Sequence, residues 1–189
     1  MIRLEAPVKT FTDLEHFYNA LVERQTEAHG DGYVAHHNII RDKAKDCKSY
    51  RELGVMQGAT AAAAALAGYE YLELIDTHPK PFMEYESLFK KYNYKLIVDS
   101  STNLIIEDRP FVDFLLIDSN HKPAHLRKEL EIHPQKVNKY ILFHDTFAVK
   151  KLQDVIDEFV KKNYTDWALV EYYQENVGYT LIKRIGNAR

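Results

Sequence analysis

Segments that favour β-strands alternate with segments that favour helices along most of the chain. Strands are expected over residues 49–55, 70–76, 94–100, 111–118 and 139–145, and helices over residues 58–68, 79–93, 122–133 and 147–163. Strands that alternate with helices predict a mostly parallel sheet with helices on both faces. The apolar run at 111–118 favours a strand that is buried on both faces of this sheet.

Residues 166–184 interrupt the alternation. Their pattern predicts two strands joined by a turn around Glu175 to Gly178. Because strands joined by a short turn run antiparallel, the sheet should carry an antiparallel strand near one edge. The expected fold class is therefore α/β: a Rossmann-like, doubly wound sheet, mostly parallel, with a C-terminal antiparallel hairpin strand.

Residues 1–47 precede the alternating region. We expect them to form a helical extension of a single domain whose core is 48–184. Thr12 followed by Glu15 is a capping-box pattern, which predicts a helix from Thr12 to about residue 28. A shorter helix is expected from about His37. The apolar stripe of the first helix must be buried. We expect it to pack on the same domain, where it can cover the site, and a homodimer contact is the alternative.

Composition argues against several classes of protein. The net charge is −3 and no long basic run is present, which argues against a dedicated nucleic-acid binder. The single cysteine, Cys47, rules out an internal disulfide framework and fits a reducing compartment. The first residues lack the apolar segment of a secretory signal peptide, and no apolar run approaches the roughly 20 residues of a membrane span. We therefore expect a cytoplasmic protein without a membrane partner.

Two glycines and a run of alanines follow the first expected strand, at the edge of the sheet where such folds bind ligands. Gly54 would let the backbone turn tightly beside a bound group, and Gly58 and the alanines would let the helix pack close to the sheet. Asp76 ends the next strand, 22 residues after Gly54, at the spacing of an acid that binds both ribose hydroxyls. The alternative is a tightly packed helix with Asp76 as a solvated turn residue.

The glycine turn lacks the features of a phosphate site. Its glycines do not form the three-glycine dinucleotide fingerprint, and the lysine and hydroxyl that end a nucleoside-triphosphate loop do not follow them. No basic residue is placed in the turn to meet a phosphate. A cofactor that has a ribose but no phosphate fits this pattern better.

Four groups that can bind a metal or move a proton fall at the carboxyl ends of two further strands: Asp118, His121, His144 and Asp145. They could converge around Mg²⁺ or Mn²⁺, with Asp118, Asp145 and His144 as ligands. They also offer a general base, since histidine titrates near neutral pH. Alternatively, His144 and Asp145 cap the following helix, and Asp118 bonds the backbone near the cofactor. His36, His37 and His125 are expected to be surface or helix-face residues.

The segments "ELGVMQGAT", "LELID", "VDFLLIDSNH" and "YILFHDT", in this order, resemble the class I S-adenosylmethionine-dependent methyltransferases. The likeness is greatest to the small branch with "IDxxH" and "HD" motifs at two strand ends. It implies a seven-stranded sheet whose last strand is antiparallel. It also implies a cofactor site: Glu52 and Gly54 near the methionine end, Gly58 in the same turn, Asp76 on the ribose, Asp99 and Ser100 near the adenine, and Asp118 beside the cofactor. In resembling sugar and macrolide O-methyltransferases, acids at the fourth and fifth strand ends hold magnesium.

The predicted function is methyl transfer from S-adenosylmethionine to an oxygen of a small hydroxylated acceptor, such as a sugar or another metabolite. His121 or His144 is the expected base, with Asp145 beside it. A metal held by Asp118 and Asp145 could instead lower the pKa of the acceptor hydroxyl. Nitrogen acceptors remain open. The alternatives are an NAD-type oxidoreductase and a non-catalytic module that keeps only the cofactor pocket.

Overall fold

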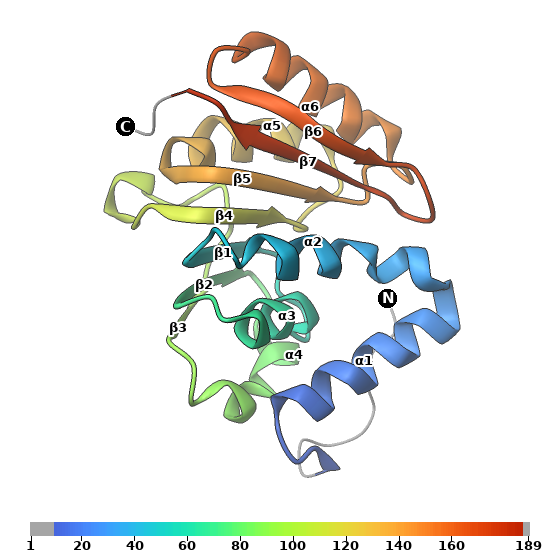
Figure 1. The fold of residues 1–189 in the computed structure, drawn as a ribbon. Coiled ribbons are helices and arrows are strands. Elements are labelled where there is room, and N and C mark those ends of the chain that lie inside the picture. Colours follow the sequence, from blue (N-terminus) through green and yellow to red (C-terminus); the bar gives the residue numbers. More distant parts are fainter. Residues whose placement is uncertain (1–9, 187–189) are drawn as a thin grey trace.

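The computed structural model describes residues 10–186 and contains one seven-stranded sheet (Figure 1). Its strands are β1 (Ser49–Leu53), β2 (Tyr71–Asp76), β3 (Tyr94–Val98), β4 (Val112–Ile117), β5 (Val137–His144), β6 (Trp167–Tyr173) and β7 (Tyr179–Arg184). Their order across the sheet is β3-β2-β1-β4-β5-β7-β6. Strands β1 to β5 are parallel, and β7 is antiparallel to both β5 and β6. The predicted fold class and the C-terminal hairpin are confirmed.

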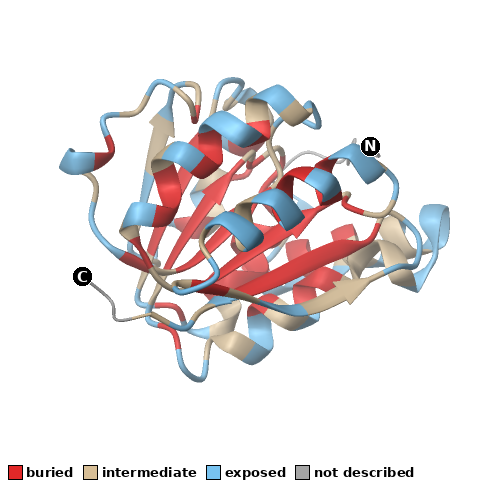
Figure 2. Cartoon of the chain, turned by 90° about the horizontal axis from the view of Figure 1, so that it is seen from above, coloured by how far each residue is buried: buried red, intermediate tan, exposed pale blue. Residues whose placement is uncertain are grey.

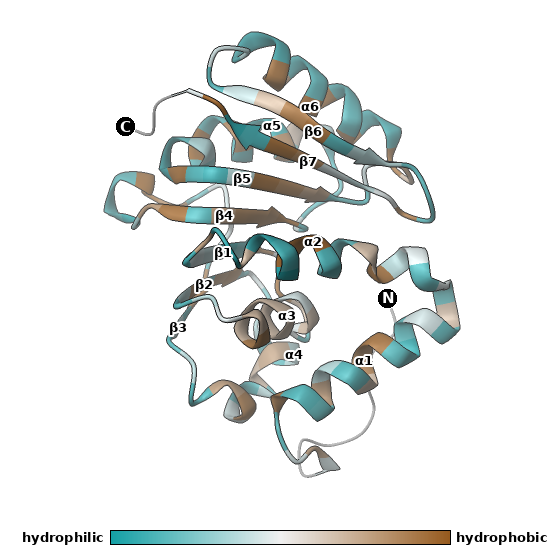
Figure 3. Cartoon of the chain, in the orientation of Figure 1, coloured by the Kyte–Doolittle hydropathy of each residue, from teal (hydrophilic) through white to brown (hydrophobic). Residues whose placement is uncertain are grey.

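Helices cover both faces of this sheet, and each face has its own apolar core (Figure 2). The helices are α1 (Leu14–His29), η2 (Asp31–Val34), α2 (Ala35–Lys43), α3 (Ala59–Ala67), α4 (Lys80–Met83), η3 (Glu86–Phe89), η4 (Ile106–Asp108), α5 (Pro123–Ile132), η5 (His133–Lys136) and α6 (Lys150–Lys162). Strand β4 shows why two cores form. Phe114 and Leu116 point to the core under α1 and α3, while Leu115 and Ile117 point to the core under α5 and α6. Figure 3 shows the resulting apolar strands.

The alanines of α3 are small because other helices pack on them. Residues Ala61–Ala65 are at most 3% exposed, and α3 lies against both α1 and α2. Side chains larger than alanine would push those helices away from the sheet. Of α3, only Ala59 and Thr60 line the cavity described below, so most of its small residues serve close helix packing rather than a ligand. Gly68, with φ of +96°, ends the helix.

Three local predictions are wrong for identifiable reasons. The N-cap of α1 is Asp13, whose carboxylate accepts the His16 amide at 2.9 Å, so the helix begins after Asp13 and the expected cap at Thr12 does not form. Helix α2 begins earlier than His37, directly after the η2 turn. The helix expected over 79–93 divides into α4 and η3, because Tyr85 leaves the helical conformation and packs its buried ring against Phe17.

The N-terminal extension packs on the body of the same domain, as expected. Leu14, Phe17 and Leu21 of α1 are almost fully buried in the core that contains α3. Among residues 10–186, no helix combines the length and the apolar character needed to cross a membrane. The first nine residues, for which the sequence predicts no secretory leader, lie outside the described residues.

Candidate functional site

A cavity of about 360 Å³ opens at the carboxyl ends of the parallel strands, near the point where the strand order reverses between β1 and β4. This is the position at which doubly wound sheets bind ligands. The sheet side contributes predicted site residues: Gly54, Asp76, Asp99, Ser100, Asp118 and His144. The N-terminal helices contribute the opposite side: Leu21, Gln25, Tyr33, His36 and His37.

Glycine is required at position 54 because the loop after β1 approaches the loop after β4 closely there. Its φ is +91°, and a Cβ atom there would lie 2.2 Å from the carbonyl oxygen of Asp118. The direction that a side chain would take is therefore filled by protein backbone, although the residue itself lines the cavity. Gly58 has a related role, because a Cβ there would lie 2.9 Å from the ring of Phe82. Gly58 is not among the described lining residues of the cavity.

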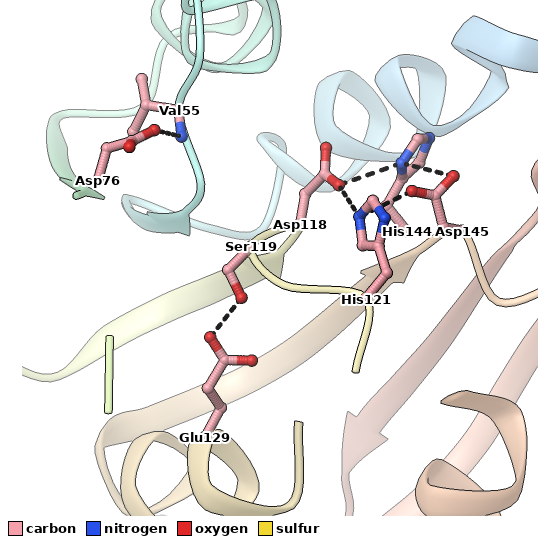
Figure 4. Close-up of polar contacts among 8 residues, drawn as sticks. All are labelled: Val55, Asp76, Asp118, Ser119, His121, Glu129, His144 and Asp145. Carbon is pink, nitrogen blue, oxygen red and sulfur yellow. Dashed lines mark hydrogen bonds and ion pairs between the residues drawn. The ribbon is translucent and has the colours of Figure 1, made fainter. Parts of the chain in front are cut away.

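Asp76 connects the end of β2 to the turn after β1. One carboxylate oxygen accepts the amides of Val55 at 2.8 Å (Figure 4) and Met56 at 3.0 Å. The other accepts the amide of His78 at 2.7 Å. Asp76 also lines the cavity. Because each carboxylate oxygen can accept more than one hydrogen bond, Asp76 can hold the turn and still accept bonds from a ligand hydroxyl.

Glu52 is fully buried and reaches the cavity only through a neighbour. Its carboxylate accepts the Tyr50 hydroxyl at 2.7 Å and the hydroxyl of Thr60, which is a lining residue. Burial raises the pKa of Glu52 to about 8, although both hydrogen bonds act in the opposite direction. Glu52 itself is not among the described lining residues. Its contacts support the floor of the cavity.

Loops after β3 and β4 form one end of the cavity. The carboxylate of Asp99 accepts the Ser100 amide at 2.6 Å, and both residues line the cavity. Behind them, the fully buried Glu129 of α5 accepts the hydroxyls of Ser101 at 2.6 Å and Ser119 at 2.5 Å (Figure 4). Burial raises the pKa of Glu129. Glu129 therefore fixes both loops to the same helix.

The four groups at the ends of β4 and β5 converge (Figure 4). His121 Nε2 lies 2.8 Å from Asp145 and 3.4 Å from Asp118. His144 Nδ1 lies 3.3 Å from Asp118 and 3.5 Å from Asp145. Asp145 has a φ of +59°, an uncommon conformation that often marks functional sites. Helix α6 has Val149 at its N-cap and no side-chain cap, so the expected alternative of helix capping does not apply.

The charges in this cluster compensate one another. Hydrogen bonds to Asp118 and Asp145 raise the pKa of His121 to about 10. Burial favours the neutral form of His144, but the two carboxylates outweigh it and raise its pKa to about 10. Burial likewise opposes ionisation of Asp118 and Asp145, yet their histidine partners lower both pKa values. Two carboxylates and two imidazolium groups therefore face each other at neutral pH.

The same cluster has the chemistry of a divalent-cation site. One ligand atom each of Asp118, His121 and Asp145 lies within 4.8 Å of the others. Carboxylate and imidazole donors suit Mg²⁺ and Mn²⁺, so these residues fit the metal that the sequence predicts. The geometry favours His121 as the third metal ligand, where the sequence predicted His144.

His36 and His37 are the site residues that sequence analysis missed. They were expected to be surface or helix-face residues; both lie on α2, but they are 4% and 3% exposed and line the cavity. The ring of His36 lies 4.1 Å from the ring of His144, centroid to centroid. Burial lowers the pKa of both residues, that of His37 to about 3. The available signal was the spacing of His36 and Ile40, which puts both on one buried helix face. His125 also lines the cavity and is only partly buried.

No protein-family model matches the sequence, and no curated protein matches it. Solved structures do match the chain. The methyltransferase PaMTH1 from Podospora anserina, bound to S-adenosyl-L-homocysteine (SAH), has a TM-score of 0.64 and 17% identity, and the match covers 92% of this chain and 88% of that one. The chain has the fold of the class I S-adenosylmethionine-dependent methyltransferases.

Two further structures show the same methyltransferase fold. The N-methyltransferase NodS from Bradyrhizobium japonicum in complex with SAH has a TM-score of 0.61 and 12% identity, with 79% of this chain and 85% of that chain covered. An rRNA methylase from Streptococcus thermophilus has a TM-score of 0.59 and 15% identity, and the match covers 80% of this chain and 94% of that chain. These methyltransferases are named for different acceptors, so the fold alone does not select one.

Proposed function

We propose that this protein is an S-adenosylmethionine-dependent methyltransferase that methylates an oxygen of a small hydroxylated acceptor, a sugar or another metabolite. The observation that carries the proposal is the cavity at the carboxyl ends of β1 to β5. Asp76 lies on one side of it and the cluster of Asp118, His121, His144 and Asp145 on the other. In the methyltransferase fold, this arrangement puts a cofactor site next to groups that can handle a proton.

The residues along the cavity suit the cofactor. Asp76, with one acceptor position left beside its three backbone amides, can accept a hydrogen bond from a ribose hydroxyl, and Asp99 and Ser100 are the residues that we assign to the adenine. The main chain around Gly54 would meet the methionine end. S-adenosylmethionine carries a sulfonium, an ammonium and a carboxylate group, so its net charge is positive, and the acidic lining favours such a ligand. When bound, this cofactor supplies an electrophilic methyl group.

The protein must align the acceptor hydroxyl and remove its proton. His144 lines the cavity, whereas His121 belongs to the candidate ligand group. Without a cation, the carboxylates hold both imidazoles protonated, and a protonated imidazole cannot act as a base. A divalent cation held by Asp118, His121 and Asp145 would compensate the carboxylate charges in place of these protons and would lower the pKa of the acceptor hydroxyl. His144, which lines the cavity, is the residue that would accept the proton of the acceptor hydroxyl.

Calorimetry tests the cofactor first. S-adenosylmethionine and SAH should bind, and NAD should not; binding of NAD alone would identify an oxidoreductase instead. Asp76→Asn should reduce the affinity for both ligands at least about tenfold, the equivalent of about 1.4 kcal/mol. Asp113→Asn is the matched control, because Asp113 also accepts a backbone amide, from Lys48 at 2.8 Å, but is not among the described lining residues.

Release of SAH in the presence of small acceptors then separates an enzyme from a binding module. His144→Gln should abolish this release while cofactor affinity persists, and full turnover in the variant would remove His144 from the mechanism. We also infer a cytoplasmic protein whose partner is a small molecule rather than a nucleic acid or a membrane. The net charge of −3 supports this inference, and sedimentation would show whether the chain forms a homodimer.

A further inference from the structure

The charged side chains that line the cavity are mainly acidic. In the part of the chain that the structure describes, the lining includes three aspartates and five histidines but no lysine or arginine. The aspartates are Asp76, Asp99 and Asp118. The guanidinium group of Arg41 lies 5.9 Å from the centroid of the Tyr18 ring, and neither residue belongs to the lining. The lining imidazolium of His144 is already balanced by Asp118 and Asp145, so an anionic group inside the cavity would meet no unbalanced positive charge and would lie close to carboxylates.

The wall opposite the sheet is made of flat, uncharged rings. The ring centroid of His36 lies 4.1 Å from that of His144 and 4.4 Å from that of His37. The Tyr33 ring stands edge-on to His144, with 6.1 Å between centroids. Burial and the negative charges of Asp118 and Asp145 raise the pKa of Tyr33, so its hydroxyl stays neutral. The wall thus offers aromatic faces and polar edges next to the carboxylates of Asp118 and Asp145 and their histidine partners.

On the basis of the proposed function, we propose that the methyl acceptor is a small planar compound that is uncharged or cationic, and that the site rejects anionic acceptors. Planar rings pack on the Tyr33 and histidine faces, and a cationic substituent gains from both the aromatic faces and the nearby carboxylates. A carboxylate or phosphate substituent would lose its hydration without gaining a partner. Discrimination against anions thus comes from repulsion as well as from missing contacts.

Three monophenols that differ mainly in the charge of the side chain test the proposal: tyramine, tyrosol and 4-hydroxyphenylacetate. Their binding to SAH-saturated protein is measured by ligand-detected NMR, first with EDTA and then with Mg²⁺. Tyramine and tyrosol should bind at least about tenfold more tightly than the carboxylate in both conditions. Equal or tighter binding of the carboxylate in either condition, or binding of none of the three, would overturn the proposal.

A charge reversal at the wall provides the second arm. Gln25 of α1 is a partly exposed lining residue, and Gln25→Lys should raise the affinity for 4-hydroxyphenylacetate several-fold while that for tyramine falls. Gln25→Met, of similar size and neutral, should leave the order unchanged. If Gln25→Lys leaves all three affinities unchanged, the charge argument fails. Failure of SAH to bind would refute the proposed function itself, so the two failures remain distinguishable.

Discussion

Buried His37 should make the protein lose stability in mild acid. Burial and the nearby positive charge of His144 lower the pKa of His37 to about 3 in the folded state, against about 6.5 in an unfolded chain. Because the pKa of His37 is lower in the folded state, the contribution of its neutral imidazole to stability is fully present above pH 6.5. This contribution is lost as the pH falls from 6.5 towards 3. Between pH 7 and pH 5, the unfolded chain gains a proton on this residue that the folded protein does not bind.

The expected size of this loss follows from the two pKa values. Each pH unit below 6.5 costs about 1.4 kcal/mol of unfolding free energy for one such group. From pH 7 to pH 5, His37 alone should therefore lower the unfolding free energy by about 2 kcal/mol. Its side chain is almost fully buried, so solvent screening reduces this figure little.

Urea unfolding at pH 7 and pH 5 provides the assay, for the natural protein and for His37→Phe. The variant replaces the imidazole with a ring that cannot titrate, and it should lose about 2 kcal/mol less on acidification. The pKa values of His121 and His144 are raised in the folded state, so these residues increase the unfolding free energy as the pH falls from 7 to 5. The effect of His37 is therefore obtained from the difference between the natural protein and the variant. Exposed His16→Gln is the control. An equal loss in the natural protein and His37→Phe would refute the reasoning.

Three other substitutions test the fold and the site. Gly54→Ala should lower the unfolding free energy by about 3 kcal/mol or more, since its Cβ would collide with the Asp118 carbonyl at a positive φ; a loss below 1 kcal/mol by urea unfolding would contradict this. Ala63→Leu should cost about 1–3 kcal/mol through overpacking of α3, while an exposed control, Ala28→Leu, should not. Asp145→Asn keeps a residue that tolerates a positive φ but removes a ligand charge, so calorimetry should show Mn²⁺ affinity falling at least about tenfold, and unchanged affinity would exclude Asp145 as a ligand.

Much of the architecture could be predicted from local patterns. The alternation of strands and helices, together with the hairpin at residues 166–184, was sufficient for the fold class. Because parallel strands bring their carboxyl ends to one edge, the convergence of Asp118 with Asp145 also followed from the sequence. These features depend on which segments form strands and on the direction in which the strands run, and local sequence patterns are sufficient to predict both.

Features that depend on contacts between distant segments could not be predicted in the same way. The alanines of α3 suggest a ligand when considered alone, but their size is set by α1 and α2. His36 and His37 face the cavity because α2 passes over the edge of the sheet. Apart from the helical spacing of these residues, the sequence gives no indication that α2 takes this path. The break between α4 and η3 depends on the packing of Tyr85 against Phe17.

The turn that carries Tyr33 is held by the opposite end of the chain. Asn176, in the loop between β6 and β7, donates a hydrogen bond to the His29 carbonyl, across 147 positions of sequence. A Cβ at Gly32 would lie 3.2 Å from Asn176, which shows how closely the two loops approach. During synthesis, β1, which leads into Gly54, and β2, which ends at Asp76, can pair long before this loop leaves the ribosome. The wall of the cavity around Tyr33, in contrast, gains its last support only when the final hairpin is made, so a nascent chain would assemble the Gly54 and Asp76 side of the cavity first.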